Sequence, residues 1–516
     1  MTIINQPDVT LNIIPAQQTI SNSDQRVLFV GQKTSSGTAT ASALTTNIGI
    51  NGEEDGLFGA TSILAQMVRS ARLINKETRF DAIALSDNAG GTQATGTVAF
   101  SGTATEDGTL TLTIGSDTNY ALTLDITSGD TATVIGELVD TAVAALTNAP
   151  FTSNNVTGTV TITCVHKGTV GNSIGLRVQG SVAGVTVALT AFASGATDPS
   201  LTSIFDVIEG ERYQTVVWQH NLTLSTLTTE LDARFNVNND ILDGVGIITL
   251  ADTYANLVSA GDAENSASLV IFGNKKLSDS VHKGGALLEF NDVISAQFAG
   301  IRSLRLTDGA NISQYVISRN GVLDSFGGTA LASKPYFNTL MPYLSLIPAG
   351  KGFSTAEVEG LFDAGVATLG NNRAQNSCIL GEIVTTRKTD AQGFEELTFQ
   401  FLNSVDTNSN AREYLVNNLK SRYAQSRLTD GDLVPGRDMA NSTSIKAYIV
   451  GLYNDLSGGD YVLTQAGSTA LTYFKENLTV TTALQSGTAT VTMKLPIVTQ
   501  LRVITGTIQV AFDTTA

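Results

Sequence analysis

The chain has 516 residues, more than a single hydrophobic core usually organises, so we expect two to four domains. Hydrophobic residues make up 42% and charged residues 15%, which excludes a mostly disordered chain. The formal net charge of −17 argues against a nucleic-acid partner, because a phosphate-binding surface would oppose the general field. The two cysteines, Cys164 and Cys378, are too few for a disulfide framework in a chain this long.

The N-terminal segment, residues 1–25, predicts an extended arm. Its two prolines argue against a helix, and Val9, Leu11 and Ile13 alternate with polar residues as one face of a strand does. No local partner strand is evident. We therefore expect this strand to be donated to another subunit.

No targeting or membrane-spanning segment is evident in the sequence. The first residues lack the basic and apolar regions of a secretory signal, and no apolar run approaches the ~20 residues that span a bilayer. We expect no membrane insertion, and we expect the chain to mature in the cytoplasm of the cell that makes it.

From Val27 the chain alternates between strand and helix patterns. VLFVG reads as a buried strand, residues 57–73 as a helix and RFDAIAL as a strand; after an interruption the rhythm resumes near Leu201. The later elements are a helix at 204–208, TVVWQ, a helix at 224–235, VGIITLA, a helix at 254–260 and SLVIFG. This alternation predicts an α/β core, with a mostly parallel sheet and flanking helices, over residues 26–87 and 198–350.

The interruption, residues 88–197, is rich in Thr, Gly, Ala and Ser and contains short alternating runs such as TLTLTIG and GVTVALTAF. It predicts an inserted β-rich domain crossed by one helix at 132–146. Insertions are tolerated at exposed loop tips, so we expect this domain to project outward.

Residues 351–516 predict an α+β C-terminal domain. Ser354 and Glu357 form a capping-box pattern that opens a helix through Leu369, and CILGEIVTTRKTDAQGFEELTFQFLN reads as a hairpin. Helices are expected at 411–428 and 444–456, followed by terminal strands in VTMKL and LRVITGTIQVAF. The last of these predicts a second donated strand, a C-terminal arm that presents Val503, Ile504, Ile508 and Val510.

The sequence predicts no catalytic, cofactor-binding or metal site. None of its three histidines has the spacing of a metal or catalytic motif, and Cys164 with His166 supplies only two candidate ligands on one strand face. The run that begins at Asp406 starts like a calcium loop, but Ala411 replaces the required glycine, so a helix N-cap explains it better.

Arg412, Lys420 and Arg427 form a positive stripe on the helix expected at 411–428, in a strongly acidic chain. Two interpretations stay open. The stripe is either a solubilising face or a contact with an acidic partner.

VTMKLPIVTQLRVITGTIQVAF, together with LFVG, the PDVTLNII arm and ATDPSL, resembles the Mu-like branch of contractile phage tail sheath proteins. The order of parts agrees over nearly the whole chain. The resemblance implies a structural virion protein, not an enzyme, that assembles as a six-start helical sleeve around a tail tube. It implies contraction that drives the tube through the host envelope for genome ejection. It also implies baseplate and tail terminator proteins as further partners.

Two other functions stay open at this point. An α/β core can carry an enzyme, because ligands often bind at the carboxyl ends of parallel strands, although fold alone cannot establish one. The chain could also be another assembly protein, such as a type VI secretion-like sheath component. Tubular polymers would favour a sheath, and discrete particles with turnover would favour the enzyme.

Overall fold

The fold is taken from a computed structural model. It describes residues 25–116, 119–235, 241–306, 336–390, 392–457 and 464–498, together with the backbone of two short paired strands, β15 (Tyr315–Ile317) and β16 (Leu323–Ser325). The predicted strand donors Val9, Leu11, Ile13, Val503, Ile504, Ile508 and Val510 all lie outside the described residues.

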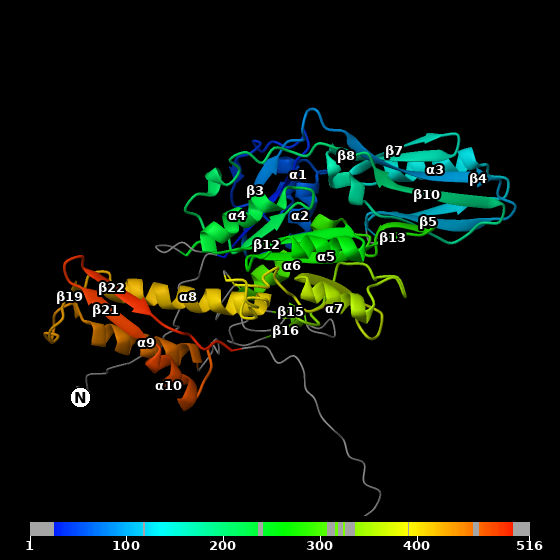
Figure 1. The fold of residues 1–516 in the computed structure, drawn as a ribbon. Coiled ribbons are helices and arrows are strands. Elements are labelled where there is room, and N and C mark those ends of the chain that lie inside the picture. Colours follow the sequence, from blue (N-terminus) through cyan, green and yellow to red (C-terminus); the bar gives the residue numbers. More distant parts are fainter. Residues whose placement is uncertain are drawn as a thin grey trace, which may run out of the picture.

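A parallel sheet forms the centre of the molecule (Figure 1). Its strands lie in the spatial order β3 (Arg79–Leu85), β1 (Arg26–Gln32), β11 (Thr215–Trp218), β12 (Val245–Asp252), β13 (Leu269–Ser278) and β17 (Val366–Asn371). Two short antiparallel strands, β2 (Leu44–Thr45) and β18 (Cys378–Leu380), pair with β3 and β17. The expected α/β core with a mostly parallel sheet is confirmed.

Helices cover both faces of this sheet, and alternate strand residues supply two separate apolar layers. One layer contains α2 (Ile63–Arg72) and α6 (Asn291–Leu306), with α1 (Glu53–Phe58) beside them. The other contains α4 (Leu224–Phe235), α5 (Tyr254–Asp262), α7 (Thr355–Asp363) and the 3₁₀ turn η2 (Asp206–Ile208). Strands buried on both faces have continuous apolar runs, which explains the sequence VLFVG of β1.

The β-rich region between β3 and β11 is built from two sheets with α3 (Ala132–Ala144) packed against them. One sheet has the order β10 (Val185–Ala193), β4 (Gln93–Gly102), β8 (Thr159–Lys167), β7 (Phe151–Val156). The other contains β9 (Leu176–Gln179), β5 (Gly108–Ile114) and β6 (Ala121–Ile126), and η1 (Thr169–Ser173) precedes β9.

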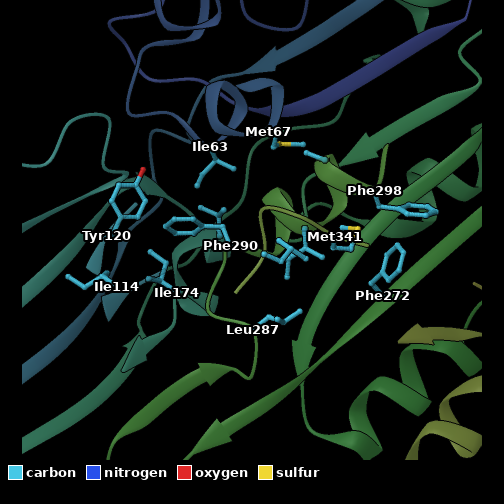
Figure 2. Close-up of a cluster of buried hydrophobic side chains, with 14 of the residues drawn as sticks. Ile63, Met67, Ile114, Tyr120, Ile174, Phe272, Leu287, Phe290, Phe298 and Met341 are labelled. Atoms are coloured by element: carbon cyan, nitrogen blue, oxygen red, sulfur yellow. The ribbon is translucent and has the colours of Figure 1, made fainter. Parts of the chain in front are cut away.

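This region continues the central sheet. The strand β14 (His282–Gly285) pairs with β13 on one side and with β9 on the other. Figure 2 shows the same continuity in the core, where Tyr120 and Phe290 meet edge to face with their ring centroids 6.2 Å apart. The β-rich region therefore shares apolar packing with the core. The proposed domain boundaries and the outward position stay predictions.

The C-terminal part contains α8 (Leu402–Tyr423), α9 (Ser442–Ser457), α10 (Ser468–Glu476) and the strand pairs β19 (Arg427–Leu428) with β20 (Met439–Ala440) and β21 (Thr479–Ala483) with β22 (Thr488–Thr492). Its apolar clusters are small. Ala411 and Leu415 of α8 pack with Leu452 and Leu456 of α9, while α9, α10 and the β21–β22 hairpin share a second cluster.

Several predicted elements are confirmed. The helix at 224–235 has the predicted bounds, RFDAIAL is β3, and both hydrogen bonds of the Ser354–Glu357 capping box are present. The helix predicted at 57–73 is instead two helices, because Gly59 adopts a φ of 85° and Ser62 caps a new start. The helix opened by Ser354 ends at Asp363 and not at Leu369, because Gly365, with a φ of 78°, leads directly into β17.

The helix predicted at 411–428 is wrong at both ends, since α8 runs from Leu402 to Tyr423. Its first turns contain weak helix formers, but Leu402 and Val405 are buried against the core, and this packing outweighs local propensity. Asp406 is therefore inside a helix and is not an N-cap. Arg427 lies beyond the helix, in β19.

Candidate assembly interface

Among the residues that the structure describes, no group of three or more His, Cys, Asp or Glu side chains is arranged to hold a metal ion. In the same part of the chain, none of the helices combines the length and apolarity that crossing a bilayer requires.

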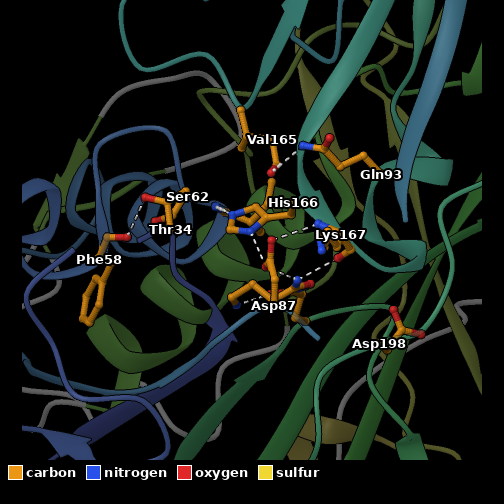
Figure 3. Close-up of polar contacts among 12 residues, drawn as sticks. Thr34, Phe58, Ser62, Asp87, Gln93, Val165, His166, Lys167 and Asp198 are labelled. Carbon is orange, nitrogen blue, oxygen red and sulfur yellow. Dashed lines mark hydrogen bonds and ion pairs between the residues drawn. The ribbon is translucent and has the colours of Figure 1, made fainter. Parts of the chain in front are cut away.

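Cys164 and His166 of β8 do not form a shared site. Burial raises the pKa of the Cys164 thiol to about 12. His166 Nε2 accepts a hydrogen bond from the Ile63 amide at 3.1 Å, so Nδ1 carries the proton and donates to Asp87 at 2.9 Å (Figure 3). This histidine joins the β-rich region to the start of α2 in the core.

Asp87 is the centre of the polar contacts at this junction (Figure 3). Besides His166, its carboxylate accepts hydrogen bonds from the Lys167 amide at 2.9 Å and from Gln32 Nε2 at 2.6 Å. Burial raises the pKa of Asp87, but the hydrogen bonds from His166, Lys167 and Gln32 outweigh burial, so the pKa of this carboxyl lies below its ordinary value of 3.8.

Ser173, His220 and Asp292 are connected in the order of a hydrolase triad, which no sequence spacing indicated. His220 Nε2 lies 2.8 Å from Ser173 Oγ, and Nδ1 lies 2.8 Å from Asp292 Oδ2. A hydrolase also needs a substrate cleft and oxyanion donors, and these three residues line neither the small cavity beside Arg302 nor the groove at the carboxyl ends of β13 and β17. Asp292 also accepts the His220 amide at 2.7 Å, so we assign the three residues a structural role that ties η1 to α6.

Charged side chains join α8 to the core. Arg302 of α6 donates to Asp406 at 2.6 Å, and both side chains are at most 4% exposed. Arg212 donates to Glu413 at 2.7 Å and lies 3.1 Å from Asp243. A cavity of about 10 Å³, the size of one water molecule, lies among these residues.

The structure places the three predicted contact residues in different surroundings. Arg412 is partly buried and donates to the Phe235 carbonyl at 3.2 Å, so it belongs to the junction between α8 and the core. Lys420 is exposed on the last turns of α8, and Arg427 is exposed in β19. Arg422 is a further exposed cation on α8 that lies close to Lys420 in sequence.

Charge is distributed unevenly along the chain. Residues 411–516 contain nine basic and eight acidic side chains, whereas residues 1–410 contain 21 basic and 39 acidic ones. The net charge is therefore +1 for residues 411–516, the C-terminal part, and −18 for residues 1–410. A C-terminal part that is close to neutral can approach an acidic neighbour without the repulsion that two strongly acidic surfaces would have.

The β21–β22 hairpin presents a small open sheet. Val480 and Val491 point to the cluster on α9, whereas alternate residues face outward. In the described part of the chain, no third strand pairs with either outer edge. Such edges offer unpaired backbone groups to an added strand.

Comparison with known proteins finds similarity to a curated tail sheath protein. No protein-family model matches the chain. A Mu-like prophage FluMu tail sheath protein of Haemophilus influenzae is 28% identical over 247 residues, which cover 46% of this chain and 50% of the relative. The match thus spans about half the length of that protein.

Solved structures also resemble the chain, at low similarity. A sheath tail protein from Desulfitobacterium hafniense is 11% identical with a TM-score of 0.43, covering 95% of this chain and 100% of its own. One from Listeria innocua is 12% identical with a TM-score of 0.44, covering 92% of each chain. The contracted helical sheath of the anti-feeding prophage is 11% identical with a TM-score of 0.45, covering 99% of each. TM-scores below 0.5 do not establish a common fold, so the comparison with tail sheath proteins rests on the sequence match. The resemblance to the Mu-like tail sheath proteins is therefore confirmed for the part of the chain that this match spans.

Proposed function

We propose that this chain is the structural subunit of a contractile tail sheath. The observation that carries the proposal is the sequence match to a tail sheath protein over 247 residues. In this proposal the subunits polymerise as a six-start helical sleeve around a tail tube and shorten to drive the tube through the host envelope. The chain is then a virion tail component, assembled in the host cytoplasm, and not an enzyme.

Strand exchange supplies the links between subunits. The donors are the N-terminal strand with Val9, Leu11 and Ile13 and the C-terminal strand with Val503 to Val510. The acceptor is the open β21–β22 hairpin of a neighbour, because its outer edges are unpaired among the described residues. Main-chain hydrogen bonds then join subunits while the arms bend as the lattice rearranges.

Contacts with the tube and with neighbouring sheath subunits are assigned to the exposed cations Lys420 and Arg427. Exposed charge pairs contribute only about 0–1 kcal/mol each, but many copies along a polymer add up and still release during contraction. Arg412 is a weaker candidate, because its guanidinium already donates to Phe235. Baseplate and tail terminator proteins are the partners expected at the ends of the sleeve.

Truncation tests this proposal. Removing Met1 to Ile20 leaves the described fold complete, because the truncation removes only residues that precede Gln25. We expect a folded subunit that no longer forms sleeves, seen by electron microscopy beside the full chain. Normal sleeves from the truncated chain would contradict strand donation, and a full chain that forms no sleeves would contradict the sheath itself.

A further inference from the structure

An open groove lies at the carboxyl ends of β13 and β17. Its volume is about 580 Å³. Apolar side chains from several elements line it: Phe337, Ile347, Phe353, Val358 and Leu369. Two of them are open to solvent, since Phe337 is 51% and Val358 37% exposed. Polar side chains, among them Asn338, Asn371 and Gln375, line the rest of the groove. Exposed apolar side chains gathered inside a polar rim are typical of a contact site.

A projecting apolar tip lies elsewhere on the same chain. Thr389 bridges Glu395, and the turn between them is closed by the Phe394 amide, which donates to Asp390 at 2.9 Å. We call residues 389, 390 and 392–397 the hairpin tip. Phe394 is 71% exposed, the highest value for a large hydrophobic side chain in the described part of the chain, and Leu397 is 59% exposed.

The tip and the groove lie at opposite ends of the same strands. The tip follows Thr386, whose amide donates at 3.0 Å to Leu269, the first residue of β13. The groove is lined by Lys275, which lies six positions further along that strand, a rise of roughly 20 Å. A second copy displaced along the strand direction would bring its tip to this groove. Head-to-tail contacts of this type build rings or open helices.

Charge at the two places is complementary. The tip carries Glu395, which is exposed. Arg373 is exposed on the turn between β17 and β18, and two other residues of this segment, Asn371 and Gln375, line the groove. Neither residue forms an ion pair within the described residues. In contrast, Lys275 inside the groove is already neutralised by Glu357, at 2.8 Å.

We propose that the hairpin tip of one copy docks in the groove of a second copy. Phe394 and Leu397 then cover Phe337 and Val358, and Glu395 faces Arg373. The inference rests on the proposed function, since it adds a contact between the folded bodies of the subunits to the exchange of arms.

Cysteine cross-linking tests this contact. Subunits with Phe394→Cys and subunits with Val358→Cys are mixed under assembly conditions and oxidised; the native Cys164 and Cys378 are buried and do not interfere. We expect a covalent dimer in the mixture and none from either variant alone. The control replaces Phe394→Cys with Val156→Cys, a residue that is 59% exposed on β7, and gives no dimer.

Absence of the dimer from the mixture, with tubes present, would overturn the docking contact and leave the sheath proposal intact. Exchanging the charges of Glu395 and Arg373 tests the same contact independently. Glu395→Arg and Arg373→Glu should each raise the concentration needed for assembly by about three- to tenfold, and the double variant should restore it. If the double variant instead needs a concentration raised by the product of the two single effects, the docking contact is also overturned.

Discussion

Replacing Asp406 by asparagine removes the carboxylate that joins α8 to the α/β core. Arg302 donates to one carboxylate oxygen and Tyr336 donates to the other, each at 2.6 Å. Arg302 also donates to Thr215 of β11, at 2.5 Å. The substitution therefore acts on a strand in the centre of the sheet as well as on α8.

The size of the effect follows from burial. The Asp406 side chain is fully buried and that of Arg302 is 4% exposed. Breaking a buried ion pair on one side leaves an uncompensated charge and costs about 3–5 kcal/mol. Because asparagine keeps one acceptor oxygen, we expect the lower end of this range, about 3 kcal/mol.

Equilibrium unfolding in guanidinium, followed by fluorescence, measures this loss. The chain has a single tryptophan, Trp218, which is buried in β11 next to the affected contacts, and dilute protein keeps the subunits apart. Lys351→Gln is the matched control, because the Lys351–Asp279 pair is 45% and 30% exposed and such pairs contribute at most about 1 kcal/mol. If Asp406→Asn shifts the Trp218 transition no more than the control does, the reasoning on the buried pair is refuted.

Three further outcomes are expected. Folding lowers the pKa of Asp87 below 3.8, so its carboxylate stabilises the folded chain above about pH 4, and this stabilisation is lost as the pH falls through the folded-state pKa. Asp87→Asn should therefore weaken the dependence of the unfolding free energy on pH at acid pH. An unchanged dependence would contradict this. Because burial raises the pKa of Cys164 to about 12, the thiol should resist alkylation at about pH 8 until guanidinium is added, as mass spectrometry of the modified chain would show. Lys420→Glu combined with Arg427→Glu should reduce the amount of the chain that sediments with tail tubes, most strongly at low salt. If the double variant still coats the tubes normally, both residues are ordinary solvated side chains.

Elements with strong local signals could be predicted from the sequence. The continuous apolar run of β1 and the regular spacing in α4 agree with their burial on the sheet. The Ser354–Glu357 capping box was also readable, because its hydrogen bonds connect residues only three positions apart. In each case the interaction that decides the structure is local or follows a simple period.

Contacts between distant segments could not be predicted in this way. Burial of Leu402 and Val405 against the core sets the start of α8. The contacts that hold its first turns come from Arg302 and Tyr336, which are 104 and 70 positions away from Asp406. The connection of Ser173, His220 and Asp292 likewise spans separate elements, and no spacing in the sequence reveals it. The predicted stripe does not lie on one helix, because α8 ends at Tyr423 and Arg427 lies in β19, while the predicted contact role of these residues stays a prediction.

Negative-stain electron microscopy of the purified full chain, over a series of concentrations, tests the sheath assignment most directly. We expect hollow tubular polymers of uniform width once a threshold concentration is passed, and sleeves around tail tubes when these are supplied. Discrete particles at every concentration, with tail tubes left bare, would contradict it.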